Sequence, residues 1–206
     1  MPIISGIEEN RGRVDILVDG VIALRVRKAH FDKCPLSAGD EIDIDAYTDR
    51  LAGIQFPEAY EAALTSLDNA AHAEKEIAQS LRRRGFVEPV VDAVLQKLRE
   101  NGLVDDARFA LRMAELHARR PVGVYAFRQK LRSKGITEDA AEDALSVFDD
   151  EQQRKACLEA AQSLYRKYAG LPAYQARGKL SQALARRGFP WDAIQDAVDQ
   201  LLEEED

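Results

Sequence analysis

Ile77-Ala78-Gln79-Ser80-Leu81-Arg82-Arg83-Arg84-Gly85-Phe86 is the stretch that decides the fold, because two related stretches follow it along the chain. The second is Phe127-Arg128-Gln129-Lys130-Leu131-Arg132-Ser133-Lys134-Gly135-Ile136, and the third is Leu180-Ser181-Gln182-Ala183-Leu184-Ala185-Arg186-Arg187-Gly188-Phe189. In each stretch a leucine lies four residues before the glycine, and a large apolar residue follows the glycine directly. Three copies with matching positions indicate a tandem repeat of about fifty residues.

The glycine in each copy predicts the end of a helix. Without a Cβ atom, glycine adopts the left-handed conformation that closes a helix at little cost. In this ending the residue after the glycine packs against the leucine before it, which pairs Phe86 with Leu81, Ile136 with Leu131 and Phe189 with Leu184. Gly102 carries the same signature. Thr137 is a candidate N-cap for the helix that follows the second copy.

Each repeat also contains an earlier helical stretch, over residues 58–69, 105–118 and 151–169. Each repeat therefore comprises three helices. The first fifty residues differ, because β-rich runs at 14–18 and 21–26 flank Asp19-Gly20, the preferred loop of a type I′ hairpin. Residues 41–45 alternate polar and apolar and predict a further strand, and residues 3–7 can supply one more.

These elements predict a mainly α protein, with three tandem three-helix repeats forming an elongated, curved solenoid behind a small antiparallel β domain at the N-terminus. We expect the β domain at residues 1–56, the first repeat at 57–103 and the second at 104–149. The third repeat, with an acidic tail, is expected at 150–206.

The composition excludes several classes of protein. The chain has 206 residues, 46% of them hydrophobic and 32% charged, which suits a packed core rather than disorder. No apolar run approaches the ~18 residues that a membrane-spanning helix needs, and the N-terminus does not resemble a secretory signal. Cys34 and Cys157 form neither a metal spacing nor a disulfide framework. We therefore expect a cytoplasmic protein with reduced thiols.

No catalytic constellation is apparent. The phosphate-loop, dinucleotide and nucleophile-elbow motifs do not occur. Asp105 and Asp106 could be read as metal-binding carboxylates, but a helix start explains them more simply. Cys157 has no histidine nearby, which favours a buried thiol over a nucleophile. We expect neither an enzyme nor a bound cofactor or metal.

Basic residues gather in one part of an acidic chain. The net charge is −7, yet residues 104–135 carry eight basic and three acidic side chains. The negative end of a helix explains Arg84, Lys134 and Arg187. Seven others have no such explanation: Arg82, Arg83, Arg119, Arg120, Arg128, Lys130 and Arg132. They are either solvated charges or a surface for phosphate or for an acidic protein face. Tyr125 and Trp191 suit either core packing or a partner contact.

The repeat resembles the RecX family of bacterial recombination regulators. The resemblance is carried by residues 81–86, by 94–110 and by 127–136. Within the second of these, Gly102-Leu103-Val104-Asp105-Asp106 is followed by Phe109-Ala110, as in the family's G-[LF]-[LVI]-[DN]-D-x-x-[FY]-[AS] core. The helical match covers residues 57–202, and the N-terminal hairpin is similar to an extension found in longer members.

This resemblance implies a non-enzymatic regulator that binds the RecA recombinase, chiefly its filament on single-stranded DNA. Such a protein restrains the ATPase, strand-exchange and co-protease activities of the recombinase. We expect a monomer that acts on the filament, with single-stranded DNA within or near it, and no membrane partner. The alternatives are a helical-repeat protein that binds DNA directly and a helical scaffold for another partner.

Overall fold

The structure is a computed structural model that describes residues 1–118 and 120–203. It divides into two compact units, Met1–Asp105 and the part that begins at Asp106. The strands are β1 (Ile4–Asn10), β2 (Arg13–Val18) and β3 (Val21–Arg27). The helices of the first unit are α1 (Lys28–Phe31), α2 (Ile44–Asn69), α3 (Glu74–Arg84) and α4 (Glu88–Glu100). Those of the second are α5 (Asp106–His117), α6 (Val124–Ser133), α7 (Glu138–Leu145), α8 (Asp150–Tyr165), α9 (Ala173–Arg186) and α10 (Trp191–Glu203).

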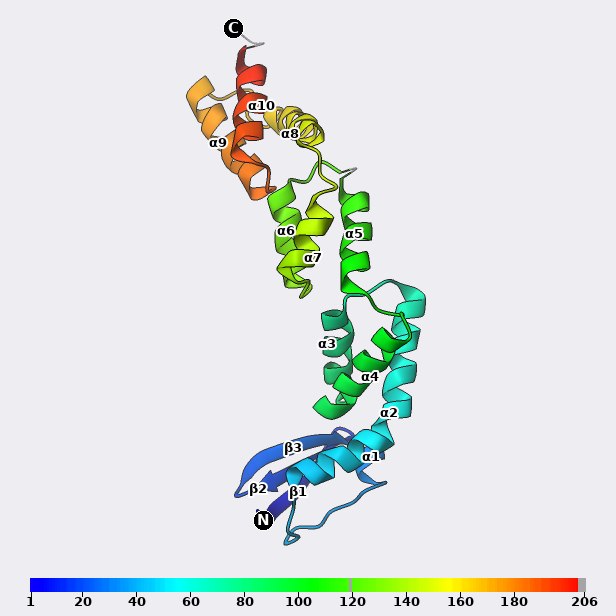
Figure 1. The fold of residues 1–206 in the computed structure, drawn as a ribbon. Helices are drawn as coiled ribbons and strands as arrows, with labels where there is room; N and C mark the ends of the chain where they lie inside the picture. The colour runs from blue at the N-terminus through cyan, green and yellow to red at the C-terminus, as the bar shows by residue number, and fades with distance from the viewer. Residues whose placement is uncertain (119, 204–206) are drawn as a thin grey trace. The chain divides into compact units, whose positions relative to one another are not determined.

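The N-terminal strands form one antiparallel sheet in the order β1-β2-β3 (Figure 1). Asp19 and Gly20 both have positive φ, at 51° and 78°, as the type I′ hairpin requires. Val14, Ile16 and Val26 are buried in the core that the sheet shares with the first helices. The predicted hairpin is confirmed.

The predicted strand at residues 41–45 is wrong. Only Glu41 forms an isolated bridge, with Ile3, and α2 begins at Ile44 and runs through Pro57. Asp43 decides the local structure, since its carboxylate accepts a hydrogen bond from the amide of Ala46 at 3.0 Å and caps the helix. Buried α2 residues then recur every four positions and pack as one stripe: Tyr47, Leu51, Gln55, Ala59 and Ala63.

The three-helix repeats have the same internal packing. In each, the three helices contact one another: α2, α3 and α4, then α5, α6 and α7, then α8, α9 and α10. The glycine that ends the second helix has φ of 85° at Gly85, 84° at Gly135 and 79° at Gly188. The amide after each glycine bonds back to the carbonyl of the predicted leucine: Phe86 to Leu81, Ile136 to Leu131 and Phe189 to Leu184. The predicted helix endings are therefore confirmed.

Within the second unit, two glycines allow the second and third repeats to touch through their backbones. The amides of Gly123 and Tyr125 donate to the carbonyls of Arg187 and Gly188, each at 3.0 Å. A Cβ on Gly123 would lie 2.1 Å from the carbonyl carbon of Gly188. Buried Gln153 completes the contact, because its Oε1 accepts the Val124 amide at 3.0 Å. The start of α6 is thus held against the α9–α10 turn.

The predicted fold class is confirmed in its elements, because the chain is mainly helical and an antiparallel sheet precedes three three-helix repeats in the sequence. The four-part division at residues 56, 103 and 149 stays a prediction. Among the residues described, no helix combines the length and apolar character needed to cross a membrane.

Candidate functional site

Three of the seven candidate residues lie on α6 in the second repeat, and two of them are paired with α7. Arg128 contacts Glu138 at 3.3 Å and Glu142 at 3.8 Å, and Arg132 contacts Glu138 at 3.4 Å. The buried side of the same helix is formed by Phe127 and Leu131. The sequence block with excess basic charge ends at residue 135, so these glutamates lie just beyond it. The structure therefore supplies acidic partners that the sequence block did not contain.

Lys130 points its ammonium group at a histidine instead of a carboxylate. Its Nζ lies 3.0 Å from Nε2 of His117, and Nδ1 of that ring lies 3.1 Å from the Met113 carbonyl. Burial lowers the pKa of His117, and the charge of Lys130 lowers it further. A neutral ring satisfies both contacts, donating from Nδ1 and accepting at Nε2. His117 therefore accepts a hydrogen bond from the Lys130 ammonium group and holds it in place.

The remaining candidates lie elsewhere. Arg82 and Arg83 belong to α3 in the first unit, where Arg82 pairs with Glu88 and Nε of Arg83 donates to the Gln79 carbonyl at 3.3 Å. Arg120 is exposed and lines a hollow of about 160 Å³ that Lys155 also lines. Arg119 lies outside the described residues. The structure thus brings together Arg128 and Arg132 beside α7, places Lys130 beside His117 of α5, and separately holds Arg82 and Arg83 on α3.

The α6 arginines remain available to a partner. The side chain of Arg128 is 41% exposed and that of Arg132 is 67% exposed. Exposed ion pairs contribute only ~0–1 kcal/mol each, because water and salt screen them. A carboxylate or phosphate of a partner can therefore replace Glu138 or Glu142 at small cost. We define Arg128 and Arg132, one turn apart on the side toward α7, as the α6 basic face.

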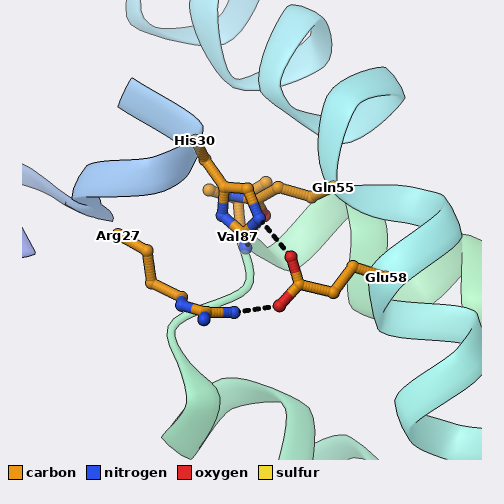
Figure 2. Close-up of polar contacts among 5 residues, drawn as sticks. All are labelled: Arg27, His30, Gln55, Glu58 and Val87. Atoms are coloured by element: carbon orange, nitrogen blue, oxygen red, sulfur yellow. Dashed lines mark hydrogen bonds and ion pairs between the residues drawn. The ribbon is translucent and has the colours of Figure 1, made fainter. Parts of the chain in front are cut away.

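Figure 2 shows a second polar cluster, at the place where β3 and α1 meet α2 in the first unit. Oε2 of Glu58 lies 2.8 Å from Nε2 of His30, and Oε1 accepts from Arg27. The hydrogen bond to His30 holds the pKa of Glu58 below its ordinary value, with Arg27 acting in the same direction. His30 is only 1% exposed, and its ring lies tilted against that of Phe86, with the ring centroids 5.9 Å apart. This cluster ties the sheet to the first repeat.

Buried Gln55 of α2 links this polar cluster to the start of α4. Its Oε1 accepts a hydrogen bond from the Val87 amide at 2.9 Å, at the N-cap of α4 (Figure 2). Among the described residues, neither Nε2 of Gln55 nor Nδ1 of His30 has a hydrogen-bond partner. The cluster holds β3, α1, α2 and the start of α4 together, and among its residues no nucleophile lies near a base, so it is structural.

Sequence reasoning missed the arginines of the sheet. Arg13 lies directly opposite Arg27 across β2 and β3, and Arg25 lies opposite Asp15. The two-residue Asp19-Gly20 loop by itself predicts Arg13 opposite Val26, which would put Arg13 on the other face of the sheet from Arg25 and Arg27. The irregularity between Ile16 and Leu17, where Ala23 is an extra residue on β3, shifts this register by one and brings Arg13, Arg25 and Arg27 to the same face.

The structure also places the other residues that the sequence analysis named. α5 begins at Asp106, directly after Asp105. Cys157 is buried, and this burial raises the pKa of its thiol to about 12, so it stays protonated. In the part of the chain that is described, no three His, Cys, Asp or Glu side chains are grouped to hold a metal. Tyr125 and Trp191 are 58% and 60% exposed, so core packing is not their role.

Comparison with known proteins gives three consecutive family matches. Residues 59–98 match the RecX first three-helix domain, 105–145 the second and 150–198 the third. The regulatory protein RecX of Chlorobium phaeobacteroides (strain BS1) is 35% identical over 145 residues, which cover 70% of this chain and 93% of the relative. That of Limosilactobacillus reuteri (strain DSM 20016) is 29% identical over 200 residues, covering 97% of this chain and 76% of the relative.

Solved structures agree with these matches. A crystal structure of regulatory protein RecX superimposes with a TM-score of 0.68 at 29% identity, covering 97% of this chain and 100% of the other. RecX from Lactobacillus salivarius gives a TM-score of 0.64 at 26% identity, over 73% of this chain and 98% of the other. The order of the three domains, their internal packing and these relatives together show that the chain belongs to the RecX family of regulatory proteins.

Proposed function

We propose that this protein binds the RecA recombinase filament on single-stranded DNA and restrains its ATPase, strand-exchange and co-protease activities without catalysing a reaction itself. The observation that carries the proposal is the match of all three RecX three-helix domains, in order, along residues 59–198. Tandem repeats suit a polymeric target, because several weak contacts along one filament add up to strong binding. The protein acts in the cytoplasm, as a monomer.

The α6 basic face is our candidate contact in the second repeat. Its arginines are exposed and exchange one carboxylate partner for another at small cost. Acidic recombinase side chains and DNA phosphate both satisfy a guanidinium group, so either is a suitable partner. The further candidates are Lys130, Arg82, Arg83, Arg119 and Arg120.

The test is co-sedimentation of the purified protein with RecA filaments formed on single-stranded DNA with a non-hydrolysable nucleotide. We expect Arg128→Gln with Arg132→Gln to weaken binding strongly, and more so at low salt, where exposed charges are least screened. Arg187→Gln is the matched control, since the side chain of this residue is also exposed at a helix end. Parent-like binding by the double variant, with loss in the control, would place the interface on the third repeat.

Neutral substitutions are preferable to charge reversal. Glutamates at these two places would face Glu138 and Glu142 and repel them, which could change the packing of α7 as well as the binding surface. Failure of the parent protein to bind the filament at all would overturn the proposal and favour the scaffold alternative. Capture of the partner from host extract would then identify what the repeats bind.

A further inference from the structure

Two adjoining hollows lie along the sheet of the first unit. The larger, about 460 Å³, is bounded by the sheet, the start of α2 and the α3–α4 turn, and its charged lining residues are Arg13, Arg25, Asp45, Arg82 and Glu88. The smaller, about 250 Å³, is lined by Asn10, Arg11, Arg13, Asp15 and Arg25. Both contain Arg13 and Arg25, so the two form one surface, which we call the sheet groove.

The carboxylates of the sheet groove are already engaged. Asp15 accepts from Nη2 of Arg25 at 2.7 Å, and these hydrogen bonds hold its pKa below the ordinary value. Glu88 is bound by Arg82 in the same way, and its pKa is lowered by that contact. Asp45 lies in the first turn of α2, where the positive end of the helix favours an acid. The charge of Arg13 also lowers the pKa of Asp15, but the hydrogen bonds of Asp15 and Glu88 go to Arg25 and Arg82, which leaves the donors of the remaining arginines available.

Arg13 is the first of these remaining arginines. It faces Arg27 directly across the strands, an arrangement of like charges that destabilises a sheet. Arg27 is compensated by Glu58, whereas Nη2 of Arg13 donates to the Arg83 carbonyl at 3.1 Å. Among the described residues, Arg13 forms no ion pair. Most of its donors are thus free to meet an anion.

Arg11 is the second of the remaining arginines of the sheet groove, and its backbone has a positive φ. It lies at the β1–β2 turn with φ of 49°, where asparagine or glycine is preferred and other residues are strained by ~1–2 kcal/mol. Its side chain is exposed and forms no ion pair within the described residues. Arg11 thus adds an exposed guanidinium group to the lining of the smaller hollow.

We propose that the sheet groove binds the phosphate backbone of duplex DNA through Arg11 and Arg13, with Arg25 and Arg82 at its sides. Phosphodiester oxygens accept the hydrogen bonds that these guanidinium groups can still donate. The only aromatic residue of either lining, Phe86, is 5% exposed, so the groove offers no platform on which unpaired bases could stack. Duplex backbone, with its higher charge density, is therefore the better ligand.

This inference goes beyond the proposed function, because it assigns the N-terminal sheet a ligand and requires no recombinase. The test measures fluorescence anisotropy of a labelled 30-base-pair duplex with the purified full-length protein alone, over a series of salt concentrations. The variant is Arg11→Asn with Arg13→Gln, in which asparagine suits the positive φ and protects the turn. The control is Arg166→Gln with Lys179→Gln, which removes two exposed charges from the third repeat.

We expect the parent and the control to bind the duplex with steep salt dependence. The sheet variant should bind roughly tenfold more weakly at low salt, and the slope of log affinity against log salt should fall by about 0.9 for each lost phosphate contact. An oligothymidine strand of equal length should bind no more tightly than the duplex. The inference fails if the parent does not bind duplex, if the sheet variant binds like the parent, if the control loses as much, or if the single strand is preferred. Filament co-sedimentation of the same variants reports separately on the proposed function.

Discussion

Arg82 donates hydrogen bonds to both carboxylate oxygens of Glu88, six residues later in the chain, and its Nε lies 3.1 and 2.9 Å from the two oxygens. One repeat later, Arg132 reaches Glu138 from the equivalent position at 3.4 Å. In both repeats the arginine precedes the helix-ending glycine by three residues and the glutamate follows it by three. In each of these two repeats the arginine–glutamate ion pair spans the turn between the second and third helices.

The third repeat cannot form this ion pair. Its equivalent positions are Ala185 and Trp191, and the indole is 60% exposed. Here the helix N-terminus at Trp191 is instead approached by Arg154 of α8, which contacts Asp192 at 3.6 Å. The repeats thus share a backbone design and differ in which side chains secure its turn.

We predict that Arg82→Ala destabilises the protein more than Arg132→Ala. Exposed ion pairs stabilise a protein by ~0.2–1 kcal/mol. The Arg82–Glu88 pair is bidentate, so we expect its contribution near the upper end of that range. Arg132 makes a single long contact with Glu138, so we expect its contribution near the lower end. Urea denaturation midpoints of the two variants measure the difference.

Glu88→Ala and the double variant with Arg82→Ala provide the control for this prediction. If the pair accounts for the effect, the two single losses should not add, because each removes the same interaction. Additive losses, or a larger loss at Arg132, would show that the arginines act through something other than these glutamates.

The sequence predicted the helix endings and the hairpin because both depend on local chemistry. A glycine with positive φ and an apolar residue after it suffice to close α3, whatever surrounds it. The start of α2 was missed for a related reason. Five alternating residues suit a strand, and nothing local shows that Asp43 caps a helix whose buried stripe continues to Ala63.

The candidate site was less predictable, since its charges are compensated across elements. Arg128 and Arg132 were selected because no local feature explained them, but their partners Glu138 and Glu142 belong to the next helix. A count of charges by sequence block cannot detect such pairs. The close approach of Gly123 to Gly188 was hidden in the same way, because it joins residues of two repeats.

We predict that Gly135→Ala destabilises the protein by ~1 kcal/mol or more. Gly135 has φ of 84°, a conformation that strains any residue with a Cβ. The denaturation midpoint measures the loss. Gly178→Ala is the matched control, because Gly178 lies inside α9 with ordinary φ and with open space where the added methyl group would lie. It should stabilise by ~0.5–1 kcal/mol, as alanine does in a helix interior; equal effects at both sites would contradict the helix-end argument.

Gly123→Ala should cost more than Gly135→Ala, about 3 kcal/mol, for a different reason. Gly123 has φ of −73°, which suits alanine, so backbone strain does not contribute. The added methyl group would instead meet the Gly188 backbone at 2.1 Å, and backbone atoms cannot move aside as a flexible side chain can. Hydrogen exchange should show faster exchange at the amides of Gly123 and Tyr125, which bond across this contact. Unchanged protection at both amides would mean that the two repeats do not touch here.

His117 should make the stability of the second unit fall as the pH drops below about 6.5. Burial and the charge of Lys130 lower its pKa below the 6.5 of an unfolded chain, so on acidification the unfolded state takes up a proton first. The contribution of the neutral ring to stability is therefore fully present above pH 6.5 and declines as the pH falls toward the folded-state pKa.

Urea denaturation midpoints measured across this pH range should fall less in His117→Gln, whose amide can still donate to Met113 and accept from Lys130. In Lys130→Gln, removal of the positive charge should raise the pKa of His117, as followed by its ring proton resonances, and weaken the pH dependence. A parent profile identical to that of His117→Gln would show that this ring titrates alike in both states.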